Sequence, residues 1–357
     1  MAPPKVLPLD NVLQSVMSLA VSEGDDLFYV ASSSGLHELF ISTGRMVKTI
    51  KFQMCMDVHI VDIPAKQMPS DLSFAGGKVL IAVYSMSSER FGLDQESYIY
   101  FYPYQGQKPR PSWTPLFQIP HQHEWGRIRK VVYSKNQGCM YISTKYDHDR
   151  RGKLQNSAIW KVNIADRGSA KLLVYKEASS MWYMALDEER NFLIVSERGD
   201  DFHHAIDIYD SVDGHHLGIV AQSPDQFPYK SKWVPYGFIF WPRGVAVDSQ
   251  GRVYVVDSGR IQEYDSAVGT FVAHIECFPF NNPKGVVLIE KTHAKRRLYV
   301  VGSQSTPRTA DRDPIHECKL FICDVQDWCS CNECRPSAKE GIESARLVNS
   351  QQFLLKE

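Results

Sequence analysis

The chain has 357 residues, and its 40 lysines and arginines nearly balance 41 aspartates and glutamates, which leaves a formal net charge of −1. This balance offers no general attraction to a phosphate backbone or to an anionic membrane, so it argues against a nucleic-acid role. A hydrophobic content of 43% and a charged content of 23% exclude a disordered chain. No apolar run approaches the roughly 18–20 residues that span a bilayer. The opening residues, MAPPKVLPLD, show no signal peptide. We therefore expect a cytoplasmic protein with no membrane span.

A repeated pattern of short strands organises the chain from its beginning. Residues 18–50 and residues 244–275 share one order: strand, polar turn, strand, Ser-Gly, strand, Gly turn, strand. Four short strands joined by turn residues form one antiparallel blade of a β-propeller. Weaker copies of the first two strands recur at four more places, and the second copy pairs residues 71–74 with residues 79–83. The six copies align on Ala20, Ser73, Val132, Ala185, Ala246 and Val287.

One of these copies matches a known repeat in detail. It reads WPRGVAVD at residues 241–248 and continues as GRVYVVDSGR at residues 251–260. This stretch resembles the NHL repeat. The resemblance implies an all-β, six-bladed β-propeller of four-stranded antiparallel blades, built as a single domain over residues 1–357 with a Cys-rich insertion near residues 318–341. Propellers of this shape range from protein or RNA scaffolds to metal-dependent lyases and hydrolases, so the fold alone selects no function.

The glycines and the two ends of the chain give further expectations about the blades. Gly244 and Gly285 open inner strands, where the absence of a side chain allows close approach of another backbone. Asp248 and Asp257 follow strand ends and are expected to accept hydrogen bonds from nearby backbone N–H groups. The strand that closes the propeller could come from residues 5–9 or from residues 345–353.

The loops of a propeller divide between two faces. Turns between the first and second strands, and between the third and fourth, lie on one face and are mostly short here. The remaining loops form what we call the long-loop face. They are long and polar or aromatic, as expected of binding segments on a rigid scaffold. These loops are residues 85–97, 103–127, 144–157, 196–204, 222–241 and 302–317.

Histidines and carboxylates gather in three of these loops and could meet at the mouth of the central channel. Imidazole and carboxylate groups suit a divalent metal such as zinc or calcium, and a desolvated carboxylate could act as a general acid or base. The alternative is that these residues are solvated loop residues, with Arg198 paired to a surface acid. The candidate binding residues at the channel mouth are His121, His123, His148, Glu197, Arg198, Asp200, Asp201, His203, His204 and Arg243.

Five of the eight cysteines fall within residues 318–334. Cys331 and Cys334 have the spacing of half a zinc site, and with Cys329 they are the candidate metal ligands of this segment. Disulfides and free thiols are the alternatives. Cys318 and Cys323 are five residues apart on one expected strand, so they should point to opposite faces and not share an ion. If residues 345–353 form the fourth strand of the last blade, the cysteine segment lies opposite the long-loop face.

Two functional hypotheses follow. The first is a non-catalytic, monomeric propeller that binds another protein through the long-loop face. It rests on the repeat architecture, the neutral charge and the absence of GxSxG, HExxH or P-loop motifs. The alternative is a metal-dependent hydrolase or lyase with its site at the channel mouth.

Overall fold

The structure is a computed structural model that consists almost entirely of β-strands. It describes residues 5–9, 13, 15–51, 53–72, 74–85, 97–104, 106, 113–146, 156–199, 203–224, 236–257, 259–267, 269–275, 282–292, 295–305 and 316–325. Within these ranges there are 24 strands, three short 3₁₀ turns and no α-helix. No helix in them is long and apolar enough to cross a membrane.

The strands form six antiparallel sheets of four strands each, numbered here as blades in chain order. Blade 1 consists of β2 (Val16–Ser22), β3 (Leu27–Ser32), β4 (Gly35–Phe40) and β5 (Met46–Lys51). Blade 2 consists of β6 (Cys55–Ile63), β7 (Gly77–Ser85), β8 (Ser97–Pro103) and β9 (Phe117–Ile119). Blade 3 consists of β10 (Arg127–Ser134), β11 (Cys139–Lys145), β12 (Ser157–Asn163) and β13 (Ala170–Lys176).

The second half of the chain repeats the same arrangement. Blade 4 consists of β14 (Ser179–Asp187), β15 (Phe192–Gly199), β16 (His204–Asp210) and β17 (His216–Gln222). Blade 5 consists of β18 (Gly244–Val247), β19 (Arg252–Asp257), β20 (Arg260–Asp265) and β21 (Thr270–Ile275). Blade 6 consists of β22 (Asn282–Thr292), β23 (Lys295–Ser305), β24 (His316–Asp324) and β1 (Lys5–Pro8). The 3₁₀ turns are η1 (Glu23–Asp25), η2 (Ala65–Gln67) and η3 (His123–Trp125).

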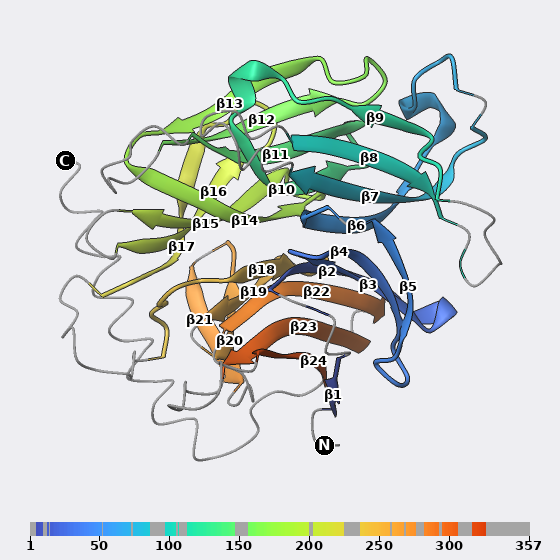
Figure 1. The fold of residues 1–357 in the computed structure, drawn as a ribbon. Coiled ribbons are helices and arrows are strands. Elements are labelled where there is room, and N and C mark those ends of the chain that lie inside the picture. The colour runs from blue at the N-terminus through green and yellow to red at the C-terminus, as the bar shows by residue number, and fades with distance from the viewer. Residues whose placement is uncertain are drawn as a thin grey trace, which may run out of the picture.

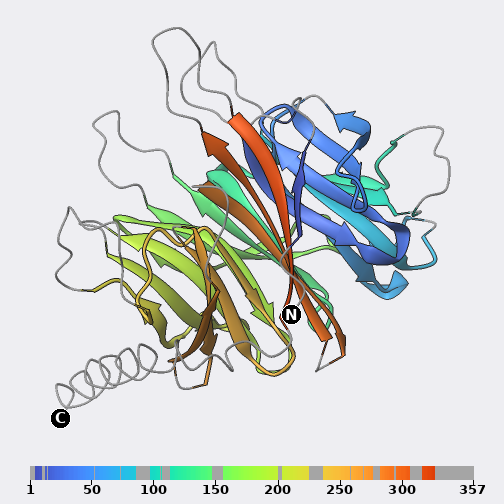
Figure 2. The ribbon, with the colours of Figure 1, turned by 90° about the horizontal axis from the view of Figure 1, so that it is seen from below.

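The six sheets close into a ring around a central axis (Figure 1). The first strand of each blade is innermost, and each inner strand contacts that of the next blade, including β22 of blade 6 against β2 of blade 1. Figure 2 shows the orange strands of blade 6 beside the blue strands of blade 1. The sequence-based prediction of an all-β, six-bladed propeller with four-stranded blades is therefore confirmed.

The N-terminal segment closes the ring. Strand β1 pairs with β24 as the fourth strand of blade 6, with Val6 opposite Phe321 and Leu7 opposite Leu320. The backbone N–H of Leu9 extends this contact to the carbonyl of Cys318 at 3.0 Å. Of the two segments that were expected to be able to close the propeller, residues 5–9 provide the closing strand. Because β1 occupies this place, the placement of residues 345–353 as the fourth strand is wrong; those residues lie outside the described part.

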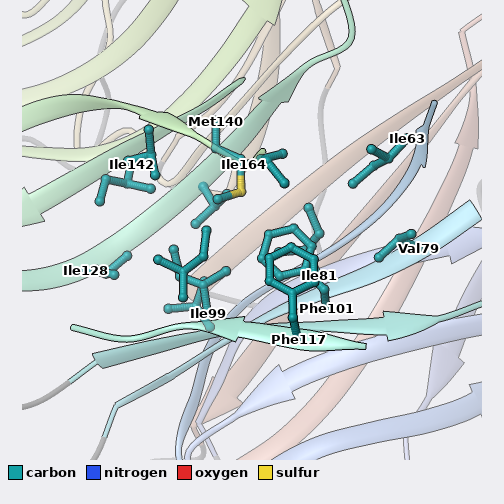
Figure 3. Close-up of a cluster of buried hydrophobic side chains, with 14 of the residues drawn as sticks. Ile63, Val79, Ile81, Ile99, Phe101, Phe117, Ile128, Met140, Ile142 and Ile164 are labelled. Atoms are coloured by element: carbon teal, nitrogen blue, oxygen red, sulfur yellow. The ribbon is translucent and has the colours of Figure 1, made fainter. Parts of the chain in front are cut away.

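The core lies between the blades, where apolar side chains from neighbouring sheets interlock. Figure 3 shows the cluster between blades 2 and 3, in which Ile81, Ile99 and Ile142 are fully buried. Phe101 and Phe117 stack there with ring centroids 4.1 Å apart. Burial of such side chains contributes roughly 1.5–3 kcal/mol each, so these inter-blade layers are the main source of stability.

The two described cysteines of blade 6 confirm their predicted geometry. Cys318 packs in the cluster between blades 6 and 1, whereas Cys323 packs in the cluster between blades 5 and 6. Their side chains therefore point to opposite faces of β24. Burial raises the pKa of both thiols, that of Cys323 to about 12, so both are held as unreactive thiols at neutral pH.

Two details of the predicted blades are wrong. The inner strand of blade 2 is β6, Cys55–Ile63, and residues 71–74 belong to the connection that follows it. In this connection Leu72 and Phe74 pack against the core as single apolar residues, without strand pairing. The expected long loop at residues 103–127 contains β9, so its first part joins the third and fourth strands and lies on the opposite face.

Close approach of the inner strands explains Gly244 and Gly285. A Cβ atom on Gly244 would lie 2.9 Å from Cγ1 of Val286 in blade 6. A Cβ atom on Gly285 would lie 3.0 Å from the Cα atom of Ser18 in blade 1. Both distances are shorter than ordinary carbon contacts, so the expectation of backbone crowding near the axis is confirmed.

Candidate functional site

The inner strands share an irregularity close to where each one begins, at the end of the axis that belongs to the long-loop face. In β2, β6, β10, β14 and β22, one extra residue interrupts the pairing with the second strand as a β-bulge. In blade 5 the corresponding residue lies directly before β18 and donates its backbone N–H to the carbonyl of Val256 at 2.7 Å. These six residues, one from each blade, are called the axial ring. They are Met17, Met56, Arg129, Trp182, Arg243 and Lys284.

The residues that directly follow them form a second layer, called the floor layer. It contains Ser18, Asp57, Lys130, Tyr183, Gly244 and Gly285. Lys130 is only 8% exposed and extends from blade 3 to blades 1 and 2, where it donates to Ser18 Oγ at 2.8 Å and to Asp57 Oδ1 at 2.5 Å.

Asp57 is fully buried, and its carboxylate is bound on several sides. Besides Lys130, it accepts hydrogen bonds from His59 Nε2 at 2.8 Å and from the backbone N–H of Val131 at 2.8 Å. Burial alone would raise the pKa of this carboxyl, but His59 and Lys130 together hold the pKa below its ordinary value. The floor layer is thus an ionised and satisfied network that ties three blades together.

The axial ring has a different electrostatic character. It contains three cationic side chains, Arg129, Arg243 and Lys284, and no acidic one. Burial, then Arg243, then Arg129 lower the pKa of Lys284 to about 8. Both of these arginines carry the same sign of charge as Lys284. The charged residues of the ring are therefore all of one sign.

A second cluster, the Trp241 cluster, lies between blades 4 and 5 on the same face. The guanidinium carbon of Arg198 on β15 is 3.8 Å from the Trp241 ring centroid, and that of Arg243 is 5.5 Å from it. His204 at the start of β16 is 5.3 Å from the same ring and 5.6 Å from the Phe240 ring. Guanidinium groups over an indole face gain a cation–π attraction.

His204 supports this cluster as a neutral ring. It is 1% exposed, and neither ring nitrogen has a hydrogen-bond partner in the described part of the chain. Burial and the neighbouring charges of Arg198, Arg243 and His203 lower its pKa to about 4. At neutral pH the imidazole is therefore uncharged and packs as an aromatic side chain.

The structure thus brings together three of the residues chosen from the sequence: Arg198, His204 and Arg243. The described contact of Arg198 is with Trp241, whereas a surface acid was expected. His203 is exposed beside the cluster, and His121 is half-buried in the connection from β9 to β10.

Several predicted residues lie outside the described part of the chain and are untested by it. They are His148, Asp200, Asp201, Cys329, Cys331, Cys334 and the side chain of His123.

Glu197 points away from Arg198, because successive residues of a strand face opposite sides. Its carboxylate binds Lys176 Nζ at 2.7 Å and Ser179 Oγ at 2.7 Å, close to Asp207. Burial and the neighbouring Asp207 raise the pKa of Glu197. This carboxyl is desolvated, but its ion network lies on the opposite side of β15 from Arg198.

The comparisons with known proteins agree with the fold. Residues 241–262 match the NHL repeat. Within this NHL repeat, Asp248 Oδ1 accepts the backbone N–H groups of Gln250 and Arg252, and Asp257 Oδ2 accepts that of Phe240. Asp248 therefore caps its own turn, as expected from the sequence, whereas Asp257 binds a backbone N–H group of the segment that precedes β18. No curated protein sequence matches the chain significantly.

Solved structures with the same fold include proteins of different activities. A luciferin-regenerating enzyme superposes with a TM-score of 0.56 at 12% identity, covering 90% of this chain and 96% of that one. A gluconolactonase from Xanthomonas campestris has a TM-score of 0.52 at 11% identity, covering 90% and 91%. The calcium-binding protein regucalcin from Agrobacterium tumefaciens has a TM-score of 0.52 at 14% identity, covering 91% and 96%. At these identities the likeness shows the fold alone.

The six side chains of the axial ring do not suit a calcium ion. Calcium is held by six to eight oxygen ligands, mostly carboxylates and carbonyls. The axial ring offers two thioethers, an indole and three cations, which repel a divalent cation. Across the described ranges, no group of three or more His, Cys, Asp or Glu residues is placed to hold a metal ion.

Proposed function

We propose that this propeller is a non-catalytic binding protein that takes an acidic segment of another protein on its long-loop face. One observation carries the proposal: Arg198 and Arg243 both lie over the Trp241 ring, next to the cationic axial ring. The whole chain has a net charge of −1, so this positive end is a local feature and not a consequence of composition.

The chemistry of the cluster suits recognition of carboxylates. Arginine offers a planar fork of N–H donors that matches a carboxylate, and an aromatic ring below it holds the fork in place. Arginine and tryptophan are also the side chains most often found at the energetic centres of protein interfaces. The charges would further accelerate encounter with an acidic partner at low salt.

The alternative, a metal-dependent hydrolase or lyase, has less support. Two of the structural neighbours are enzymes, but their likeness extends to the fold only. The side chains described at the axial end are cationic or apolar, and the one buried carboxylate of the floor layer is engaged by Lys130 and His59.

A pair of synthetic peptides tests the proposal. A glutamate-rich peptide should bind the protein with an affinity that falls as salt is added, and its glutamine-rich counterpart should not bind. Arg198→Gln should weaken the glutamate-rich peptide about five- to tenfold, which corresponds to roughly 1–1.4 kcal/mol. Both affinities can be measured by fluorescence anisotropy or calorimetry.

Arg167→Gln is the matched control. Arg167 is also an arginine in contact with one partner, Asp71, but it lies in the exposed turn between β12 and β13 on the opposite face. Its replacement should leave the affinity unchanged. Equal binding of the two peptides, or equal effects of the two substitutions, would contradict the proposal.

A further inference from the structure

Trp241, the aromatic centre of the Trp241 cluster, has a strained backbone. Its φ angle is +54°, in the left-handed region that large side chains rarely adopt. The next residue is Pro242, and a proline favours an extended conformation at the residue before it. A left-handed conformation at such a position costs free energy and persists only where surrounding contacts impose it. The contacts that impose it here come from the ends of β19 and β20.

Two hydrogen bonds hold the backbone on either side of Trp241. On one side, the backbone N–H of Phe240 donates to Asp257 Oδ2 at 3.0 Å. On the other side, the backbone N–H of Arg243 donates to the carbonyl of Val256 at 2.7 Å. Val256 and Asp257 are consecutive residues at the end of β19, so both ends of this short segment are fixed to one strand.

The preceding part of the segment is held by two further side chains of blade 5. Gln262 Oε1 accepts the backbone N–H of Gly237 at 3.0 Å, and Gln262 Nε2 donates to the carbonyl of Phe238 at 2.7 Å. Arg260 donates to the same carbonyl at 3.0 Å and to Asp257 Oδ1 at 2.9 Å. Asp257 and Gln262 are both fully buried. The three side chains Asp257, Arg260 and Gln262 are called the blade 5 clamp.

We infer that Asp257 is a positioning residue: it holds Trp241 in its strained conformation, so that the indole ring lies beneath Arg198 before a partner binds. The distance of 3.8 Å between the Arg198 guanidinium carbon and the Trp241 ring centroid depends on this placement. A surface that is fixed in advance loses less conformational entropy on binding. Asp257 is fully buried, so it acts on the partner only through Trp241, and the inference in this respect rests on the proposed function.

The negative charge of Asp257 gives the test a clear sign. Its carboxylate binds the residue next to Trp241, close to a surface proposed to bind carboxylates. By electrostatics alone, removal of this charge would strengthen the binding of an acidic peptide. Loss of positioning predicts the opposite. We expect Asp257→Ala to weaken the glutamate-rich peptide about five- to tenfold, measured by fluorescence anisotropy well below the melting temperature of the variant.

Asp248→Ala is the matched control. Asp248 belongs to the same NHL repeat, is 4% exposed and binds an arginine, Arg296. Asp257 likewise binds Arg260. However, Asp248 lies in the turn between β18 and β19, on the face opposite the long-loop face. Its removal should lower stability and leave the peptide affinity unchanged. Unchanged or stronger binding by Asp257→Ala, or equal weakening by both variants, would overturn the inference.

A second measurement does not depend on the peptide. Hydrogen exchange followed by mass spectrometry should show faster exchange of the amides of residues 236–243 in Asp257→Ala than in wild type or in Asp248→Ala. If wild type does not bind the peptide, the proposed function fails, and the exchange pattern alone decides whether Asp257 holds Trp241. Equal exchange in the three proteins would overturn the inference. If Asp257→Ala does not fold, Gln262→Met takes its place, with the same expected and contradicting results.

Discussion

Lys130 and Lys284 lie in adjacent layers of the same inner wall, yet their surroundings are opposite. Lys130 in the floor layer is bound by Asp57 and Ser18 and lies 5.9 Å from the Tyr183 ring centroid. Lys284 in the axial ring is half-buried, and the charges that perturb it are two arginines. One lysine is part of a satisfied network, and the other keeps its charge at a cost.

The two lysines show the difference between a charged group whose hydrogen bonds stabilise the fold and one whose charge lowers stability. A buried ion pair whose hydrogen bonds are all made holds neighbouring strands in register. Removal of one partner leaves the other charge buried without a counter-ion. Like charges held near one another lower stability, and perturbed charged groups of this kind are candidates for a functional role.

The largest expected effect comes from breaking the floor layer. Asp57→Ala should lower the free energy of unfolding by about 3–5 kcal/mol, because it leaves Lys130 buried without its counter-ion. The folded-state pKa of Asp57 lies below its value in the unfolded chain, so this loss applies fully at neutral pH. It should shrink as the pH falls below about 4, where the carboxylate becomes protonated in the unfolded wild-type chain. Urea unfolding at several pH values measures it.

Asp62→Ala provides the comparison on the same strand. Asp62 is 60% exposed and pairs with Lys135 at 3.4 Å on the surface. Its removal should change stability by less than about 0.5 kcal/mol. If both variants unfold at the same urea concentration, the floor layer does not stabilise the propeller as described.

The next effect tests the crowding of the inner strands. Gly244→Val should destabilise the protein by about 2–3 kcal/mol, because its Cβ would collide with Val286 of the next blade. Gly218 in the outer strand β17 has no atom within 4 Å of a Cβ position and no positive φ. Gly218→Val should therefore be neutral or slightly stabilising. Thermal unfolding that ranks the two variants in the opposite order would contradict the assigned geometry.

The smallest expected effect is an increase in the free energy of unfolding. Lys284→Met should raise stability by about 1–2 kcal/mol at pH 7, since a pKa shift costs roughly 1.4 kcal/mol per unit and partial exposure reduces it. Lys284 has a pKa of about 8 in the folded protein and 10.5 in the unfolded chain. Between these values the unfolded wild type binds more protons, so wild-type stability rises with pH. The advantage of the Met variant should be complete below pH 8 and disappear above about pH 10.5.

Much of the fold was predictable because most blades begin with a short hairpin and one carries a full NHL repeat. Blade 2 was misassigned for a physical reason. Its inner strand contains Asp57, His59 and Asp62, and a long connection separates it from β7, so residues 71–74 looked like the better partner. Polar residues are tolerated in this buried strand because Asp57 is satisfied by other blades.

The site was predictable only where it lies in loops. Arg198, His204 and Arg243 were candidates because they belong to or border long loops, whereas Arg129 and Lys284 were missed. Each occupies a bulge inside or at the edge of a strand and forms no local motif. The sequence feature that could have identified them is their shared position. Each lies three residues before the residue on which the six repeat copies were aligned. It becomes consistent in all six blades only when blade 2 is aligned on His59.

The central claim is that Lys130 in the floor layer is stabilised by its counter-ion, whereas the only charges that perturb Lys284 in the axial ring are like charges. The most direct test is to measure the unfolding free energies of Lys130→Met and Lys284→Met side by side at pH 7. We expect Lys130→Met to be less stable than wild type by about 3 kcal/mol or more, and Lys284→Met to be more stable. Changes of the same sign in both variants would contradict the claim.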